Sequence, residues 1–114
     1  MLEDVTRRIV AFRDEREWKQ FHSPRNLAAS ISIEAAELLE VFQWSTDATL
    51  ADDVETRRED LERELADIAI YTLLMAHETG IDLEAAIVAK LAENEAKYPT
   101  EKARGSREKY TKLR

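Results

Sequence analysis

Glycine and proline are scarce in this sequence, and their scarcity restricts the fold more than any other feature. The 114 residues contain only two of each, and Gly80, Pro24 and Pro99 fall at the ends of periodic segments rather than inside them. Both residue types interrupt helices. Elsewhere apolar residues recur at the three- and four-residue spacing of amphipathic helices. The pattern predicts an all-α protein.

The periodic segments define four helices and the signals that bound them. Ser23 followed by Pro24 is typical of a helix start, and so is Asp82, whereas Gly80 suits a helix end. We expect a loop over residues 45–53. The predicted helices cover residues 2–19, 24–44, 54–79 and 83–97, which gives a four-helix bundle.

The predicted helices expose apolar faces that one short chain would leave unpaired. The first carries Val5, Ile9 and Phe12 at helical spacing, and the third is apolar on nearly every side from Ile68 to Ala76. A chain of 114 residues builds only a modest core. We therefore expect the bundle to oligomerise through its helices. Residues 1–99 form the predicted helical domain, and residues 100–114 form a basic tail.

Charge and composition narrow the class of partner. The formal net charge is −7, which argues against nucleic acid as the main partner because phosphate backbones are bound by clustered basic surfaces. There is no cysteine, and no long apolar run follows the acidic start of the sequence. We expect a cytoplasmic protein without a signal peptide or a membrane partner.

Carboxylates occupy positions that should be apolar. On the second predicted helix, Glu34 lies in the middle of a buried stripe, and Glu37 lies at its edge one turn later. On the third, Glu64 and Asp67 flank the predicted buried line, together with Tyr71. The second-helix stripe consists of Leu27, Ile31, Leu38 and Val41, and the third-helix line consists of Leu61, Leu65, Ile68 and Thr72.

Four facing carboxylates predict a metal site. Burying clustered carboxylates is costly unless cations compensate their charge, and oxygen-only ligands favour Mg²⁺, or Mn²⁺, over zinc or copper. The alternative is that these acids are ordinary helix-surface residues paired with Lys or Arg. A ferritin-like di-iron site needs Glu-x-x-His pairs, and neither His22 nor His77 has a Glu three residues before it.

The spacing Glu34-x-x-Glu37 followed by Glu64-x-x-Asp67 resembles that of the all-α nucleotide pyrophosphohydrolases, the superfamily of MazG, dimeric dUTPases and phosphoribosyl-ATP pyrophosphohydrolase. Further segments are similar to the dCTP pyrophosphatase branch. They are EWKQFHSPRNL (17–27), ELLEVFQW (37–44), NEAKYP (94–99) and KYT (109–111). The resemblance covers almost the whole chain.

The resemblance implies a dimer of dimers, that is, a homotetramer, with Mg²⁺ on Glu34, Glu37, Glu64 and Asp67. It also implies that the base is recognised by Trp18 and Trp44, with help from His22, Tyr71 and Asn94. Ile9 stands where relatives of the animal enzyme carry a pocket histidine, and this departure bears on the base preference.

The residues themselves leave several of these roles open. Trp18 and Trp44 lie at predicted helix ends, where a flat base could stack between them, but they are also typical core or interface anchors. Lys90, Asn94 and Lys97 share one helix face that could grip phosphate or could simply be solvated. The basic tail could close over a triphosphate or pair with a neighbouring subunit. We expect His77 and Met75 to lie in or near the core.

The predicted activity is Mg²⁺-dependent conversion of a nucleoside triphosphate, dCTP or a related cytosine nucleotide, to the monophosphate and pyrophosphate. Water would attack the α-phosphorus, with Glu34 or Glu37 orienting or deprotonating it and Lys97 among the substrate-binding groups. The alternatives are a broad-specificity or phosphoribosyl-ATP pyrophosphohydrolase, and a non-catalytic helical interaction module. The tryptophan pair argues against a phosphoribosyl-ATP substrate.

Overall fold

The computed structural model describes residues 2–113, and every regular element in this range is helical. The elements are α1 (Leu2–Glu15), η1 (Trp18–Phe21), α2 (Pro24–Val41), α3 (Leu50–Thr56), α4 (Arg58–Thr79), α5 (Leu83–Lys97), α6 (Thr100–Ala103) and η2 (Tyr110–Lys112), where η marks a 3₁₀ helix. The all-α prediction is confirmed. Within the described residues, however, there are six α-helices rather than the predicted four.

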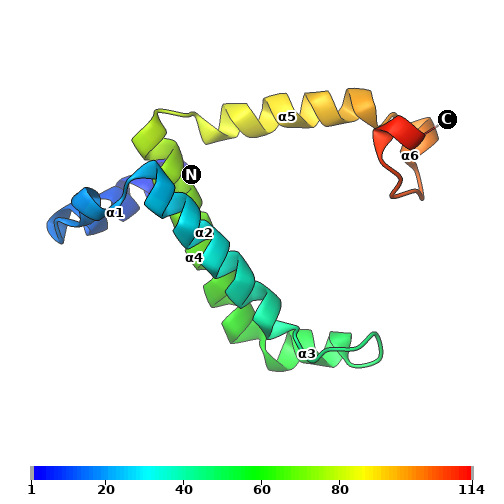
Figure 1. Ribbon diagram of the computed structural model, residues 1–114, viewed down its shortest axis with the longest axis horizontal. Helices are drawn as coiled ribbons and strands as arrows, with labels where there is room; N and C mark the ends of the chain where they lie inside the picture. The colour runs from blue at the N-terminus through cyan, green and yellow to red at the C-terminus, as the bar shows by residue number, and fades with distance from the viewer. Residues whose placement is uncertain (1, 114) are drawn as a thin grey trace. The chain divides into compact units, whose positions relative to one another are not determined.

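The chain divides after Gly80 into two compact units. In the first unit, α2 and α4 pack side by side along their lengths, with α1 at one end of the pair and α3 at the other (Figure 1). The buried apolar residues of this unit are Leu27, Val41, Leu73, Leu74 and Ala76. Three of these five come from the second half of α4, as the apolar run between residues 68 and 76 predicted.

The first predicted helix is shorter than expected. It ends at Glu15 rather than at residue 19, because Glu17 adopts a left-handed conformation with φ 55° that α-helix cannot accommodate. A 3₁₀ turn, η1, follows from Trp18. The helix packs on α4 and is half-buried as predicted, although its most buried residue is Arg13 and not one of the apolar stripe.

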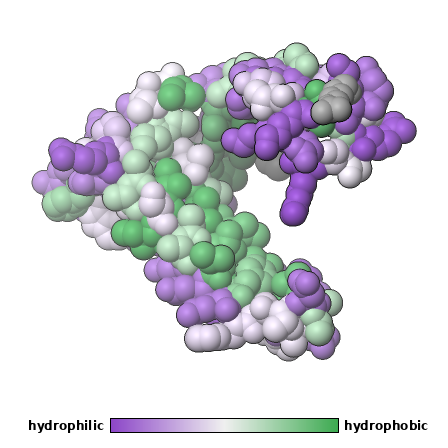
Figure 2. Space-filling model, turned by 45° about the vertical axis from the view of Figure 1, so that its right-hand side comes forward, coloured by the Kyte–Doolittle hydropathy of each residue, from purple (hydrophilic) through white to green (hydrophobic). Residues whose placement is uncertain are grey.

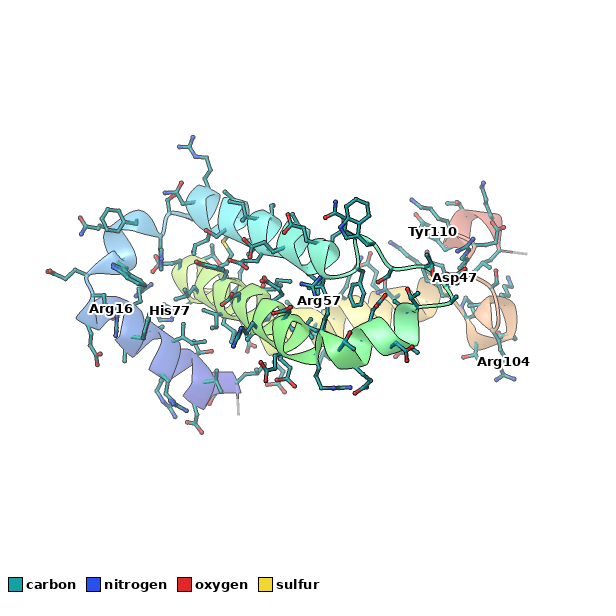
Figure 3. All side chains as sticks on the ribbon, turned by 90° about the horizontal axis from the view of Figure 1, so that it is seen from below. Arg16, Asp47, Arg57, His77, Arg104 and Tyr110 are labelled. Carbon is teal, nitrogen blue, oxygen red and sulfur yellow. The ribbon has the colours of Figure 1, made fainter. Side chains whose placement is uncertain are left out.

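The second and third predicted helices are also interrupted. The second ends at Val41, and α3 begins inside the segment expected to be a loop, at Leu50, and runs to Thr56. Arg57 separates α3 from α4 with a non-helical backbone, and its guanidinium donates to the Val41 carbonyl at 3.0 Å (Figure 3). Asp53 holds the preceding turn by accepting from the Ser45 and Thr49 hydroxyls at 2.6 and 2.8 Å.

The local start and stop signals behave as predicted. Ser23 accepts from the Asn26 N–H to cap α2, and Asp82 accepts from the Ala85 N–H to cap α5. Gly80 ends α4 in the left-handed conformation, with φ 69°.

Two burial predictions are wrong. Leu65 is 52% exposed, because it lies to one side of the face on which Glu64 and Ile68 are turned towards α2. His77, expected in or near the core, is exposed and lines a shallow groove between α1 and α4 (Figure 3). Met75 is partly buried, as expected.

The second unit contains α5, α6 and η2. No residue of α5 is buried, and Ile87, Val88 and Leu91 are exposed on it. Tyr98 and Tyr110 form an edge-to-face pair with ring centroids 6.1 Å apart. Of the predicted basic tail, the structure describes residues 100–113, so Arg114 lies outside the described residues.

Apolar residues cover much of the α2–α4 pair on the face seen in Figure 2. Even so, none of the described helices is both long enough and apolar enough to cross a membrane.

Candidate functional site

Three carboxylates from α2 and α4 meet where the two helices pack together. Glu34 and Glu37 lie one turn apart on α2, and Glu64 approaches them from α4. One oxygen of each residue lies within 4.8 Å of the others. The structure thus brings together three of the four acids that the sequence proposes as metal ligands.

Two of these carboxylates contain buried oxygens without a partner. Glu34 Oε2 and Glu64 Oε2 are shielded from solvent and accept no hydrogen bond. Within residues 2–113, no Lys, Arg or His forms an ion pair with Glu34, Glu37 or Glu64, although eight ion pairs are formed elsewhere. Buried carboxylate oxygens are normally paired, so these two are suited to binding a cation.

The cluster also changes the acidity of Glu34. Its pKa is raised from 4.5 to about 7, first because only the protonated form can donate a hydrogen bond to the adjacent Glu64 carboxylate, then because burial disfavours the charge. Glu37 raises this pKa further in the same way and through its negative charge, and Asp67 adds a smaller charge effect. The site therefore concentrates negative charge that a cation would neutralise.

Asp67 and Tyr71 extend the acidic face of α4. Asp67 lies one turn after Glu64 and is close enough for its charge to act on Glu34. It is not among the three residues whose oxygens lie within 4.8 Å of one another. Tyr71 lies one further turn along and is partly exposed. Both residues remain predicted members of the site.

The donor set fits a hard divalent cation. The cluster provides only carboxylate oxygens, the ligands that Mg²⁺ and Mn²⁺ prefer. Two of these oxygens are buried and accept no hydrogen bond from the protein, so their lone pairs are available to a cation. Glu34, Glu37 and Glu64 are therefore able to hold a metal ion.

The two tryptophans lie at opposite ends of α2. Trp18, in η1 before the helix, is 43% exposed and packs edge-to-face on Phe12 at 5.6 Å, whereas Trp44, beyond the helix, is 85% exposed. The 18 residues of α2 span about 27 Å. The expectation that one base stacks between both indoles is therefore wrong within a single chain.

His22 lies between η1 and α2, next to the capping Ser23. Its Nδ1 atom is buried and has no hydrogen-bond partner. A buried ring nitrogen without a partner is unusual, and it is a suitable group for a polar ligand.

Asn94 and Lys97 lie on α5 in the second unit, and a contact of theirs with substrate remains a prediction. Asn94 is partly buried. Lys97 Nζ pairs with Glu93 at 2.9 Å and lies 4.8 Å from the centre of the Tyr110 ring. Lys90 pairs with the same Glu93 at 3.4 Å, so one carboxylate partly neutralises the cationic face.

The sequence reasoning overlooked Arg13 and Arg57. Arg13 follows Ile9 by four residues, one helical turn, so it places a charge on the buried side of α1. The same signal had singled out Glu34. Arg57 carries no comparable signal, because its role depends on the position of the Val41 carbonyl 16 residues earlier.

Comparison with known proteins identifies the family. dCTP pyrophosphatase 1 of Homo sapiens is 41% identical over 98% of this chain and 67% of its own length, and that of Rattus norvegicus is 40% identical with the same coverage. A pyrophosphatase crystal structure from Archaeoglobus fulgidus matches with a TM-score of 0.82 and 42% identity, over 85% of this chain and 91% of the other. Residues 29–113, which include all four acids, match the MazG-like family. This chain belongs to the MazG-like family.

Proposed function

We infer that this protein hydrolyses a nucleoside triphosphate, dCTP or a related cytosine nucleotide, to the monophosphate and pyrophosphate in a Mg²⁺-dependent reaction. The observation that carries the proposal is the cluster of Glu34, Glu37 and Glu64, with two buried oxygens that lack any partner. The names of its relatives, dCTP pyrophosphatase 1 and an archaeal pyrophosphatase, support the reaction class. We place this activity in the cytoplasm.

The carboxylates of the cluster have two tasks in this proposal. Glu34, Glu37, Glu64 and Asp67 hold Mg²⁺, which when bound would neutralise phosphate charge and act as a Lewis acid. Glu34 or Glu37 orients a water molecule and accepts its proton as the water oxygen attacks the α-phosphorus. The bond from the α-phosphorus to the bridging oxygen breaks, and pyrophosphate leaves with the electron pair.

Base recognition requires a second chain in this proposal. Because Trp18 and Trp44 lie at opposite ends of α2, a base held between two indoles takes one from each of two chains. His22, with its unpaired buried Nδ1, lies near Trp18 and offers a group for the polar edge of cytosine. Tyr71 is a further group proposed for the base pocket, and Asn94 and Lys97, in the second unit, remain predicted to bind the base and the phosphates.

Exposed apolar residues support association through α2 and α4. Ile33 and Leu39 on α2 are 58% and 71% exposed, and they lie on the side opposite the stripe that packs on α4. Ile70 on α4 is exposed as well. Two α2–α4 pairs packed against each other would bury this surface and make the four-helix bundle from two chains. Two such dimers would form the expected homotetramer.

Pyrophosphate release across a panel of nucleotides tests the function. The full chain, freed of metal, is assayed with dCTP, CTP, dTTP, dATP and dGTP with and without Mg²⁺. We expect Mg²⁺-dependent turnover with the highest kcat/KM for a cytosine nucleotide. Equal turnover of purines would instead indicate a broad-specificity pyrophosphohydrolase, and no turnover of any triphosphate would refute the activity.

A further inference from the structure

Arg13 is the most deeply buried charged residue among those the structure describes. Only 2% of its surface is exposed, and no other polar or charged residue in residues 2–113 is buried. Its Nη1 atom donates to Glu78 Oε1 on α4, 65 residues away in the sequence. Its Nε and Nη2 atoms lie 3.0 and 2.9 Å from the Asp14 carboxylate. The guanidinium thus joins the end of α1 to the end of α4.

A buried ion pair of this kind specifies geometry more than it contributes stability. Removing a guanidinium from water is costly, and the pairing with carboxylates largely offsets that cost rather than exceeding it. The pair does impose strict alignment, because the planar guanidinium must meet both carboxylates at once. The Arg13–Glu78 contact therefore fixes the position of α1 along α4.

The end of α1 in turn supports Trp18. Phe12, the neighbour of Arg13, packs its ring edge-to-face on Trp18, with ring centroids 5.6 Å apart and an interplanar angle of 77°. Arg16 holds Phe12 from another side, because its guanidinium lies 3.7 Å from the ring centre and donates to the Phe12 carbonyl at 2.9 Å. Figure 3 labels Arg16 at this end of the helix.

The segment that carries Trp18 is short. It is a four-residue 3₁₀ helix that begins after the left-handed Glu17. Four residues are too few for a self-supporting helix, so contacts with α1 decide where the indole lies. Phe12 is therefore the route by which the Arg13–Glu78 contact reaches Trp18.

We propose that Arg13 is a positioning residue: through its contact with Glu78 it fixes the end of α1 and so holds Trp18 in place for base stacking. This role rests on the proposed function, because it assumes that Trp18 binds the base. Arg13 itself touches neither metal nor substrate in this proposal.

Steady-state kinetics with Arg13→Met and Glu78→Gln test the role. Arg13→Met removes the contact with a side chain of similar length, and Glu78→Gln weakens it, because the amide oxygen can still accept a hydrogen bond but no longer carries a charge. We expect KM for dCTP to rise by roughly three- to tenfold, with kcat and the Mg²⁺ activation constant within about twofold of wild type. Arg13→Lys, which keeps the charge, should recover part of the loss. Arg7→Ala, which removes an exposed ion pair with Asp4 on the same helix, is the matched control.

A double-mutant cycle separates this role from simple destabilisation. Once Trp18 is replaced by Ala, Arg13→Met should cause no further rise in KM, because the side chain through which it acts is gone. Independent, multiplicative effects on KM would overturn the proposal. An unchanged KM in both Arg13→Met and Glu78→Gln would do so as well.

A measurement without turnover keeps the test independent of the proposed activity. In a Trp44→Phe background Trp18 is the only indole, so acrylamide quenching of its fluorescence reports the exposure of Trp18 alone. Arg13→Met and Glu78→Gln should each raise the quenching constant, and Arg7→Ala should not. If wild type hydrolyses no nucleotide but quenching still rises, the proposed function fails and the support of Trp18 by Arg13 stands. If quenching is unchanged, Arg13 does not hold Trp18.

Discussion

Glu34 carries a charge at a position on the packed face of α2. Burying a charged carboxylate is costly unless a cation compensates it. Its unpaired Oε2 atom and its raised pKa have the same cause, which is the surrounding carboxylates and the burial of the group. This conflict is visible in the sequence, because Glu34 interrupts an apolar stripe at helical spacing. Its partner Glu64 could be suspected but not placed, since only the packing of α2 on α4 brings the two together.

Glu34→Gln should therefore abolish Mg²⁺ binding and turnover while raising the thermal stability of the metal-free protein. A neutral amide removes one of the clustered charges without changing size, so the helical circular dichroism signal should be retained. Isothermal titration with Mg²⁺ and melting curves in chelator measure both effects. Glu40→Gln, an exposed acid on the same helix, is the control and should leave both unchanged.

The stability gain in Glu34→Gln should depend on pH in a defined direction. The folded-state pKa of Glu34, about 7, lies above the ordinary 4.5, so between these values the folded metal-free protein binds more protons than the unfolded chain. The contribution of protonated Glu34 to the stability of the folded protein is complete below pH 4.5 and is lost as the pH rises through about 7. The difference in Tm between Glu34→Gln and wild type should thus be small at about pH 4.5 and grow to a plateau above about pH 7.5. A difference that is constant with pH, or that shrinks as pH rises, would contradict the assignment.

At the scale of helices, the sequence predicted those helix ends that are set by interactions with neighbouring residues in the chain. Ser23, Asp82 and Gly80 act through their own backbone and nearest neighbours, so their roles could be identified without a structure. The break between α3 and α4 at Arg57 could not, because neither glycine nor proline marks it. Arg57 leaves the helical conformation and reaches back to the end of α2, a contact that exists only in the folded chain.

Arg57→Ala should destabilise the protein by about 1–2 kcal/mol, because the Val41 carbonyl loses a charge-assisted hydrogen bond. The two hydrogen bonds from Arg57 to Asp60 Oδ2, at 3.0 and 3.1 Å, are lost as well. Urea denaturation measures the change. Arg58→Ala is the matched control, because Arg58 pairs only with the exposed Glu55 among the described residues, and it should have a much smaller effect. Equal destabilisation by both variants would show that the Val41 contact contributes nothing.

At the scale of the whole molecule, large apolar side chains remain exposed on the α2–α4 pair. Ile33, Leu39 and Leu65 are each more than half exposed. Exposed apolar side chains on packed helices are candidates for an interface. Sequence periodicity indicated the need for partners, and the helix it predicted over residues 24–44 already placed Trp18 before one end and Trp44 at the other. The structure confirms that α2 is a single continuous helix between them.

We expect the protein to be an oligomer at micromolar concentration, and light scattering coupled to size exclusion should report a tetramer. Replacing Leu39 with Glu would place a charge in the centre of the buried surface and should shift the protein to smaller species. The same variant should lose activity, because in the proposed assembly each site takes one indole from each of two chains. Arg7→Glu, which introduces the same charge at an exposed position on α1, is the control and should leave the mass unchanged. A fully active monomer would contradict the assembly.

Complementation between two defective variants tests directly whether Trp18 and Trp44 meet across chains. Trp18→Ala and Trp44→Ala should each raise KM for dCTP roughly tenfold, since stacking of a base on an indole contributes about 1–3 kcal/mol. When the two variants are refolded together, a mixed dimer contains one site with both indoles and one with neither. Random pairing therefore restores about a quarter of all sites to the wild-type arrangement, and a low-KM component should appear in the kinetics.

The control for this experiment mixes Trp18→Ala with a double variant that lacks both indoles. No chain then carries Trp18, so no pairing can rebuild a complete site and the low-KM component should be absent. The low-KM component should appear in the first mixture and not in the control. That result is expected only if each base pocket takes residues from two chains. If the first mixture behaves as the plain average of its two parents, the indoles do not meet across chains, and the base is held by one tryptophan or by neither.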